Sequence, residues 1–223
     1  MNGDSTISSK GNPIPHATME RLPRYLMQLY RFRVIGDANV SSQALGESLG
    51  LKDTQIRKDL SYFGVFGKAR YGYNIDFLID ALEKILGLTR VYNLAIVGAG
   101  NIGRALATYR GFESREFRVK LIFDNNKGLI GQDIGGIVVQ DFRLLEEKIK
   151  EIPVDIAIIA VPEKAAYEVA ETLVKAGIKA IYNFTPAELH HHEGVFIEHA
   201  SISFGIYKLA HHLSGHWPRK SQR

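Results

Sequence analysis

Three glycines have the spacing G-x-G-x-x-G, a pattern that can bind the pyrophosphate of a dinucleotide. They follow the apolar run LAIV and begin a helical stretch, which is the context that the pattern requires. The first permits a tight turn, the second lets the backbone approach the pyrophosphate, and the third lets the helix pack on the strand. The residues expected to bind the phosphates are Gly98, Ala99, Gly100, Asn101, Ile102 and Gly103.

An acidic residue stands at the spacing expected for a ribose ligand. Asp124 ends the apolar stretch VKLIFD, 21 residues after Gly103 (124 − 103). A carboxylate at this point can accept hydrogen bonds from the adenine-ribose hydroxyls and would repel a 2′-phosphate. The sequence therefore predicts NAD(H) rather than NADP(H). The alternative, that Asp124 only forms a turn before NNKG, leaves the spacing unexplained.

Alternating strands and helices follow the glycine motif. We expect strands at 136–139, 154–162, 179–184 and 194–199, with helices at 142–150 and 163–176. Such alternation predicts a doubly wound parallel sheet of the Rossmann type over residues 91–200. The strand ends expected to line the nicotinamide end of the site are Val161, Pro162, Asn183 and Phe184.

Little of the chain remains beyond this sheet. We expect a helix at 201–214 and a basic tail at 215–223, which leaves no segment for a substrate domain. No catalytic constellation of side chains stands out near the expected nicotinamide position. We therefore expect the dinucleotide to be a signal rather than a hydride donor.

Two short helices precede this domain in the stretch SSQALGESLGLKDTQIRKDLSYF, residues 41–63. Ser41 or Ser42 is expected to cap the first helix and Gly50 to end it, and Asp53 or Thr54 to cap the second. The connecting turn has the length found in a helix-turn-helix. In the second helix Ile56, Leu60 and Phe63 form the inner stripe. The polar positions expected to meet DNA bases and phosphates are Lys52, Gln55, Arg57, Lys58, Ser61 and Tyr62.

A glycine-rich segment with aromatic residues, GVFGKARYGYN, follows the second helix and predicts a small β-hairpin. Its expected DNA contacts are Lys68, Arg70 and Tyr71. A first helix from Glu20, with Pro23 in its first turn, and a linking helix in 74–93 complete a winged helix over 16–90. The apolar residues in register on the linking helix are Phe77, Leu78, Ala81, Leu82, Ile85 and Leu86. A basic wing tip suits the minor groove or the DNA backbone.

The composition narrows the function classes. Residues 1–90 carry 12 Lys and Arg against 9 Asp and Glu, and no cysteine is present, which excludes a disulfide or a thiolate-bound metal. No apolar run is long enough to span a bilayer, and residues 1–15, expected to form a flexible arm, lack a signal-peptide core, so we expect a cytoplasmic protein. The run HHHE at 190–193 is expected to be a surface loop and not a metal site.

Three functions fit these features. The first is a DNA-binding repressor controlled by NAD(H). The second is a small NAD-dependent oxidoreductase with an N-terminal oligomerisation domain, which turnover of NADH with a carbonyl substrate would reveal. The third is an architectural DNA-binding protein that uses NAD only structurally, which DNA affinity independent of ligand would reveal.

The chain resembles the Rex family of redox-sensing transcriptional repressors. The resemblance covers about residues 14–213 and rests on RLPRYLMQL, SSQALGESLGL, QIRKDLSYFG, YGYN, LAIVGAGNIGRAL and NFTPAEL. It implies a homodimer with a winged-helix domain, a Rossmann domain and a C-terminal helix swapped onto the partner. It also implies a palindromic operator on double-stranded DNA that NADH causes the protein to release.

The sequence departs from the family at two charged positions. Members commonly carry an arginine in the first helix and an aspartate before the C-terminal helix, which act with a tyrosine in sensing NADH. Met27 and Ser201 occupy the charged positions, and only Tyr109 matches. Since either charge alone would be uncompensated, joint loss is expected if the pair works as a unit. The sequence thus predicts a weakened or differently wired NADH response.

Overall fold

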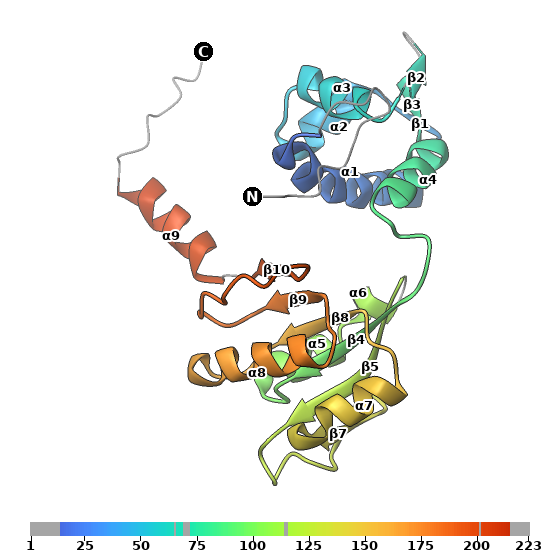
Figure 1. The fold of residues 1–223 in the computed structure, drawn as a ribbon. Coiled ribbons are helices and arrows are strands. Elements are labelled where there is room, and N and C mark those ends of the chain that lie inside the picture. Colours follow the sequence, from blue (N-terminus) through green and yellow to red (C-terminus); the bar gives the residue numbers. More distant parts are fainter. Residues whose placement is uncertain (1–13, 65, 69–71, 114–115, 201, 215–223) are drawn as a thin grey trace. The chain divides into compact units, whose positions relative to one another are not determined.

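The computed structural model describes residues 14–64, 66–68, 72–113, 116–200 and 202–214. It divides into two compact units, Met1–Arg90 and Val91–Arg223. The first unit holds four helices and a small sheet, and the second holds the large sheet with its covering helices (Figure 1). The predicted DNA-binding residues lie in the first unit and the predicted nucleotide-binding residues in the second.

The first unit is built on the long helix α1, His16–Val34, which contributes Leu22, Tyr25, Leu26 and Leu29 to the core. The helix begins four residues before the expected Glu20, with Pro15 at its N-cap position. Pro23 therefore lies inside the helix, and its expected place in the first turn is wrong. The earlier turn forms because Thr18 is 2% exposed and its hydroxyl bonds Asp59, so this turn packs inward.

Helices α2 (Ser42–Leu49) and α3 (Asp53–Ser61) form the expected helix-turn-helix. Ser41 caps α2, since its hydroxyl accepts the Ala44 N–H at 3.0 Å, and Gly50 ends it in the left-handed conformation. The N-cap of α3 is Lys52, one residue before the expected Asp53 or Thr54. Helical bonding starts there because the Gln55 and Ile56 N–H groups donate to the Lys52 carbonyl.

A three-stranded antiparallel sheet forms the wing, in the order β1-β3-β2. The predicted hairpin is present as β2 (Gly67–Lys68) and β3 (Gly72–Asn74), and it gains β1 (Asn39–Val40), which the sequence did not predict. Arg70 and Tyr71 lie outside the described residues.

Helix α4, Ile75–Ile85, follows the wing and buries Leu78, Ile79 and Leu82. Phe77, which the sequence places in register with Leu78 and Leu82, is instead 57% exposed. Asn74 caps the helix by accepting the Phe77 N–H, which sets the first turn so that Phe77 points outward. Its ring lies 6.3 Å from that of Phe66.

The second unit contains a seven-stranded sheet in the order β10-β9-β8-β4-β5-β7-β6. Its strands are β4 (Tyr92–Val97), β5 (Phe117–Asp124), β6 (Asp133–Ile134), β7 (Ile137–Asp141), β8 (Ile156–Ile159), β9 (Ala180–Asn183) and β10 (Phe196–His199). All pair in parallel except β6, a two-residue edge strand antiparallel to β7 that the sequence did not predict. The strand order reverses at β4, which has β5 on one side and β8 on the other, and doubly wound sheets bind ligands at such a point.

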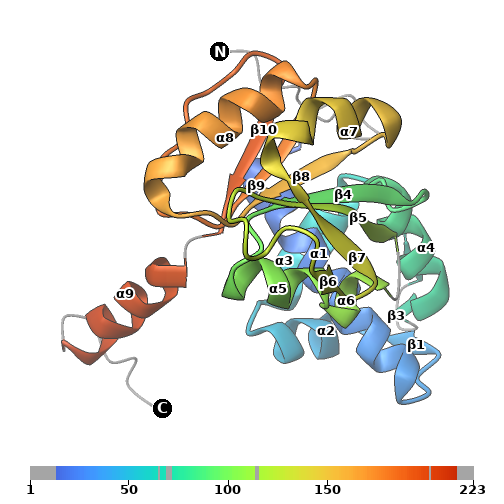
Figure 2. The same cartoon turned by 90° about the horizontal axis from the view of Figure 1, so that it is seen from below.

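Helices cover both faces of this sheet (Figure 2). One face carries α7 (Leu145–Glu151), preceded by the 3-10 turn η1 (Phe142–Leu144), and α8 (Glu163–Lys175), and the other carries α5 (Asn101–Ala107) and α6 (Arg110–Glu113). Alternate residues of β4 enter different cores, Ala95 and Val97 in one and Leu94 and Ile96 in the other. This confirms the predicted doubly wound sheet.

The last described element is α9, Ile202–Leu213, and every residue of it whose side chain is described is exposed. These include Ile206, Tyr207, Leu209 and Leu213, which are 61% to 88% exposed. In the described part of the chain this helix therefore presents apolar side chains without packing on a core.

Candidate functional site

The glycine loop joins β4 to α5 and is shaped by two close backbone approaches. Gly98 has φ +104°, and a Cβ on it would overlap the carbonyl of Ala160 at the end of β8. A Cβ on Gly103 would overlap the Gly98 carbonyl. Only glycine fits either position, which confirms a tight turn and close packing of helix on strand.

Gly100 has a different role, because a Cβ on it would meet no atom within 4 Å. The space over this residue is open, as it must be if a ligand is to approach the backbone there. A dinucleotide fits this loop: its pyrophosphate would lie over Gly100 and accept hydrogen bonds from N–H groups at the start of α5.

Asp124 lies beside the loop at the carboxyl end of β5. Its Oδ2 accepts the Ala99 N–H at 2.7 Å and its Oδ1 accepts the Asn126 N–H at 2.8 Å. The carboxylate thus fixes the glycine loop and also forms the turn, while its role as a ribose ligand stays a prediction. Each oxygen keeps a lone pair, because a carboxylate can accept about four hydrogen bonds.

A cavity of about 330 Å³ opens at the carboxyl ends of β4, β5 and β8. The predicted residues that line it are Gly98, Gly100, Asp124, Val161 and Pro162. The other lining residues were not predicted as ligands: Val97 at the end of β4, Ala160 just after β8, and Asn125, Asn126, Leu129, Phe142, Ala165, Glu168 and Val169 from the β5–β6 loop, η1 and α8. No Lys or Arg is among its described lining residues, so backbone N–H groups would have to bind the phosphates.

The remaining predicted nucleotide ligands do not line this cavity. Asn101 and Ile102 are exposed in the first turn of α5, next to Gly100. Tyr109 follows α5, is 57% exposed and packs edge-on against Phe112 at 5.2 Å. Phe184 packs against Tyr182 at 4.6 Å.

Asn183 at the end of β9 is fully buried. Its amide donates to the Ala187 carbonyl at 2.8 Å, and its Oδ1 accepts the Thr185 N–H at 2.9 Å. The side chain therefore holds the turn after β9 and has no exposed surface for a ligand.

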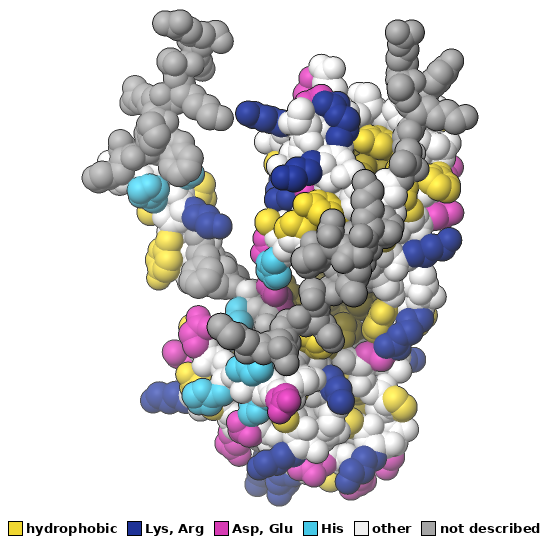
Figure 3. Space-filling view, turned by 45° about the horizontal axis from the view of Figure 1, so that its top comes forward, with side chains coloured by type: hydrophobic (Ala, Val, Ile, Leu, Met, Phe, Trp, Pro, Cys, Tyr) yellow, Lys and Arg dark blue, Asp and Glu magenta, His cyan; other side chains and the backbone are white. Residues whose placement is uncertain are grey.

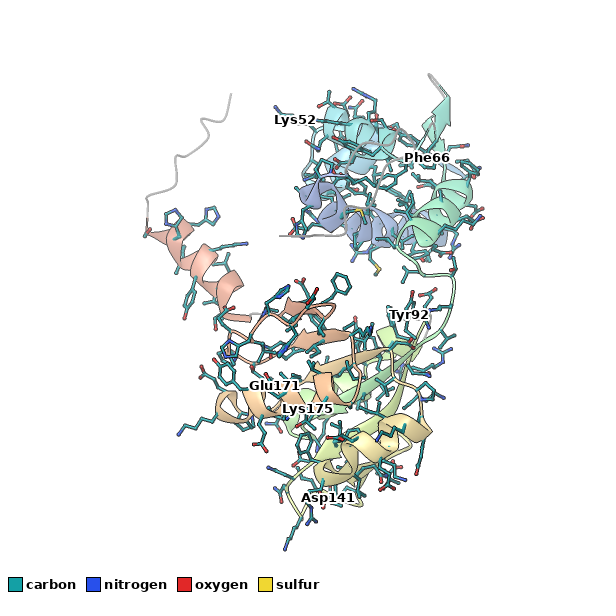
Figure 4. The ribbon with its side chains drawn as sticks, viewed as in Figure 1. Lys52, Phe66, Tyr92, Asp141, Glu171 and Lys175 are labelled. Carbon is teal, nitrogen blue, oxygen red and sulfur yellow. The ribbon has the colours of Figure 1, made fainter. Side chains whose placement is uncertain are left out.

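The predicted DNA-binding residues of α3 fall into two groups. Lys52, Lys58 and Ser61 are exposed, and Tyr62 is half-buried. Arg57 is exposed but held, since its Nη1 lies 2.7 Å from Asp53 Oδ2 and donates to the Ser42 hydroxyl at 3.0 Å. Lys and Arg side chains are spread over both units in the space-filling view (Figure 3), and Lys52 stands at the start of α3 (Figure 4).

Gln55 takes part in hydrogen bonding inside the unit, because its amide donates to Asp59 at 2.8 Å. Asp59 is fully buried and is the only charged residue buried in the described chain. It also accepts bonds from the Arg21 guanidinium at 2.6 and 2.8 Å, the Tyr25 hydroxyl at 2.5 Å and the Thr18 hydroxyl at 3.0 Å. This Asp59 network joins α3 to α1.

The network changes the pKa of its members. Burial alone would raise the pKa of Asp59, but hydrogen bonds from Arg21, Tyr25, Gln55 and Thr18 outweigh it and hold the pKa below its ordinary value. Burial, together with the bond to Asp59, raises the pKa of the Tyr25 hydroxyl. Asp59 is therefore a carboxylate at neutral pH.

The histidine run lies between β9 and β10, outside helices and strands. His192 Nε2 lies 3.2 Å from Glu171 Oε1, and the His190 ring is 5.7 Å from that of Tyr167. Within the described residues, no group of His, Asp or Glu is arranged to hold a metal ion.

Known proteins resemble both units. A family model described as "CoA binding domain" matches residues 89–187, and one described as "Putative DNA-binding protein N-terminus" matches residues 13–61. The redox-sensing transcriptional repressor Rex of Caldanaerobacter subterraneus subsp. tengcongensis is 41% identical over 206 residues, which is 92% of each chain. The chain belongs to the Rex family. It is thus a transcriptional regulator rather than an enzyme.

Solved structures of a Rex relative share the fold. RSP, a Rex-family repressor, in complex with beta-NAD+ and operator DNA is 39% identical, with a TM-score of 0.86 over 92% of this chain and 94% of RSP. RSP in complex with beta-NADH is 38% identical, with a TM-score of 0.83 over 91% and 95%. In this Rex chain, none of the helices described is long and apolar enough to cross a membrane.

Proposed function

We propose that this Rex protein represses transcription by binding a palindromic operator in the cytoplasm, and that NADH releases it. The observation that carries the proposal is the pairing of two sites in one chain. One unit has a helix-turn-helix that exposes Lys52 and Lys58 and is followed by a wing, and the other has a glycine-loop cavity next to Asp124. A relative with the same fold has been solved with operator DNA and NAD+ and with NADH.

On DNA, α3 would enter the major groove. The exposed Lys52, Lys58 and Ser61 suit phosphate and base contacts, with Tyr62 beside them. Arg57 is already placed by Asp53 and Ser42, which reduces the entropy lost on binding. Gln55 supports Asp59 instead of reading a base. The wing residues Lys68, Arg70 and Tyr71 complete the proposed surface.

In the second unit, the dinucleotide would lie across the carboxyl ends of the strands. Backbone N–H groups of Gly100–Gly103 would bind its pyrophosphate and Asp124 its adenine ribose, since the Gly98 and Ala99 N–H groups already donate to the Phe123 carbonyl and to Asp124. Val161 and Pro162 would contact its nicotinamide half. Asn183 would not contact the nucleotide; it would hold the turn after β9, which contains Phe184. The bound nucleotide would act as a signal and undergo no reaction.

We further propose that two copies form a dimer through α9. This helix exposes Ile206, Tyr207, Leu209 and Leu213, which pack on nothing in the described chain. A second copy that covers them would remove this apolar surface from water. A two-fold dimer would then explain a palindromic operator.

The NADH response is proposed to be weaker than in other Rex proteins, or differently wired. Met27, at the arginine position of the family, is 55% exposed on α1 and brings no charge. Ser201, at the aspartate position, lies outside the described residues. Release of operator by low NADH, with no release by equal NAD+, would contradict this part of the proposal.

Selection of a random duplex DNA pool by the purified full-length protein tests the function. The proposal predicts a palindromic consensus, and calorimetry should show NADH bound to the same preparation. Recovery of unrelated sequences with no palindrome would contradict a dimeric repressor. Steady oxidation of NADH with an added carbonyl compound would instead support an oxidoreductase.

A further inference from the structure

Two carboxylates end neighbouring strands: Asp124 lines the nucleotide cavity, and Asp141 lies beside Asp124 but outside that lining. Strands β5 and β7 pair in parallel, and their register sets Asp124 directly beside Asp141. Both residues are the last of their strands, and Asp141 stands where β7 passes into η1 (Figure 4). Like charges at paired positions repel, so a cation has to compensate them.

Arg143 supplies that compensation. Its Nε donates to both oxygens of Asp141, at 3.0 and 3.1 Å, and its Nη2 donates to Oδ2 at 2.5 Å. The Arg143 backbone N–H also donates to Asp141, at 2.9 Å, so the carboxylate caps η1. The hydrogen bonds from Arg143, helped by the charge of Lys127, lower the pKa of Asp141 to about 2.

The two side chains of this pair differ in exposure. The Asp141 side chain is 18% exposed and the Arg143 side chain is 82% exposed. The Asp141 side chain is therefore held in place, whereas Arg143 is a surface side chain that its hydrogen bonds to this carboxylate hold against Asp141. Without the charge on Asp141, the guanidinium would be available to another anion.

The pair lies next to the expected ribose end of the cavity. Phe142, between Asp141 and Arg143, lines the same cavity as Asp124, Asn125 and Asn126. Rossmann sites that accept a 2′-phosphate on the adenine ribose use a nearby arginine, whereas those that reject it use an acidic residue. This chain has both residue types here, and its arginine is bound to a second acid.

We propose that Asp141 is a specificity-determining residue that excludes nucleotides with a phosphate on the adenine ribose. It does so by binding Arg143, whose guanidinium would otherwise be available to a phosphate on that ribose. Asp124 alone would leave an arginine available near the ribose. This inference rests on the proposed binding of NADH in the same cavity.

The test is titration of the full-length protein with NADH and NADPH, followed by the fluorescence of each reduced nucleotide. D141N keeps an acceptor for the Arg143 N–H and should fold normally. We expect D141N to bind NADPH at least tenfold more tightly than the natural chain does, with NADH affinity unchanged within threefold. R143Q alone should leave the affinity for both nucleotides unchanged within threefold.

The double variant D141N/R143Q tests whether Arg143 causes the tighter NADPH binding of D141N. The proposal predicts that the tighter NADPH binding is lost, because the guanidinium that binds the phosphate is gone. An unchanged NADPH affinity in D141N would overturn the proposal, and a full gain in D141N/R143Q would overturn the role of Arg143. If the natural chain bound neither nucleotide, the proposed function itself would fail, which is a separate outcome.

Discussion

Asp59 holds helix α3 in place on α1. Its carboxylate receives five hydrogen bonds, from Thr18, Arg21, Tyr25 and Gln55, and all donors except Gln55 come from α1. A buried charge is tolerated only when its bonds are satisfied in this way. The network therefore fixes α3 on α1 in one orientation, as the proposed role of α3 in reading DNA requires.

Asp59→Asn should destabilise the first unit by about 3 kcal/mol, because Arg21 loses its charged partner in a largely buried setting. Amide hydrogen exchange of α1 and α3 in the full chain measures this loss. Asp53→Asn is the matched control: its pair with Arg57 is exposed, so the loss should stay below about 1 kcal/mol. Equal exchange in the two variants would contradict a structural role for the network.

The same network predicts an acid dependence. The folded-state pKa of Asp59 is lowered, so its contribution is complete above the ordinary aspartate pKa of about 3.9. It is lost as the pH falls through the lower folded-state value. Exchange of α3 amides should rise in this acidic window, and Asp59→Asn should remove this part of the rise.

Lys58 and Asp124 are expected to separate the two activities. Lys58→Ala removes an exposed charge from α3 and should weaken DNA binding about tenfold without changing NADH affinity. Asp124→Ala removes a ribose acceptor and the bond to the Ala99 N–H, so it should weaken NADH binding about tenfold and leave DNA binding of the ligand-free protein unchanged. If both variants lost both activities, the division into two sites would be wrong.

At the scale of the elements, the sequence predicted those with a strong period or a fixed motif. Local patterns correctly predicted the strand before Gly98, the caps Ser41 and Gly50, and the alternation of strands and helices after Asp124. It did not predict the two-residue strands β1 and β6, because a pairing that short is fixed by its partner strand and leaves no periodic pattern.

The sequence did not predict some contacts of the sites, because the residues involved are far apart along the chain. Asp59 lies three residues after Ile56, on the inner stripe of α3, so its burial was readable from the helical period. Its partner Arg21 is 38 residues away, and no local pattern indicates such a contact. Phe142 and Glu168 reach the cavity only because η1 and α8 fold over the same strand ends.

The glycine loop offers a paired test at this scale. Gly103→Ala places a Cβ against the Gly98 carbonyl, so it should lower the melting temperature and weaken NADH binding together. Gly100→Ala places its Cβ in open space, so the free protein should melt as before while NADH binding falls at least tenfold. Unchanged NADH affinity in Gly100→Ala would place the pyrophosphate elsewhere.

At the scale of the whole molecule, Met27 and Ser201 address the coupling between nucleotide and DNA. Coupling requires that NADH and NAD+ differ in affinity for two states of the protein. Met27→Arg together with Ser201→Asp should lower the NADH concentration needed for release about tenfold. Each single variant should improve release less, since its charge has no partner. If the double variant released DNA at the same NADH concentration as the natural chain, the response would depend on other residues.

Titration of the operator complex with NADH and with NAD+ at fixed salt tests the central claim most directly. The operator is the palindrome found by selection, and binding is followed by fluorescence anisotropy of the labelled duplex. The account predicts that NADH releases the DNA only at a higher concentration than other Rex proteins need, and that the same concentration of NAD+ leaves the DNA bound. Operator binding that is indifferent to both nucleotides would contradict a redox-sensing repressor.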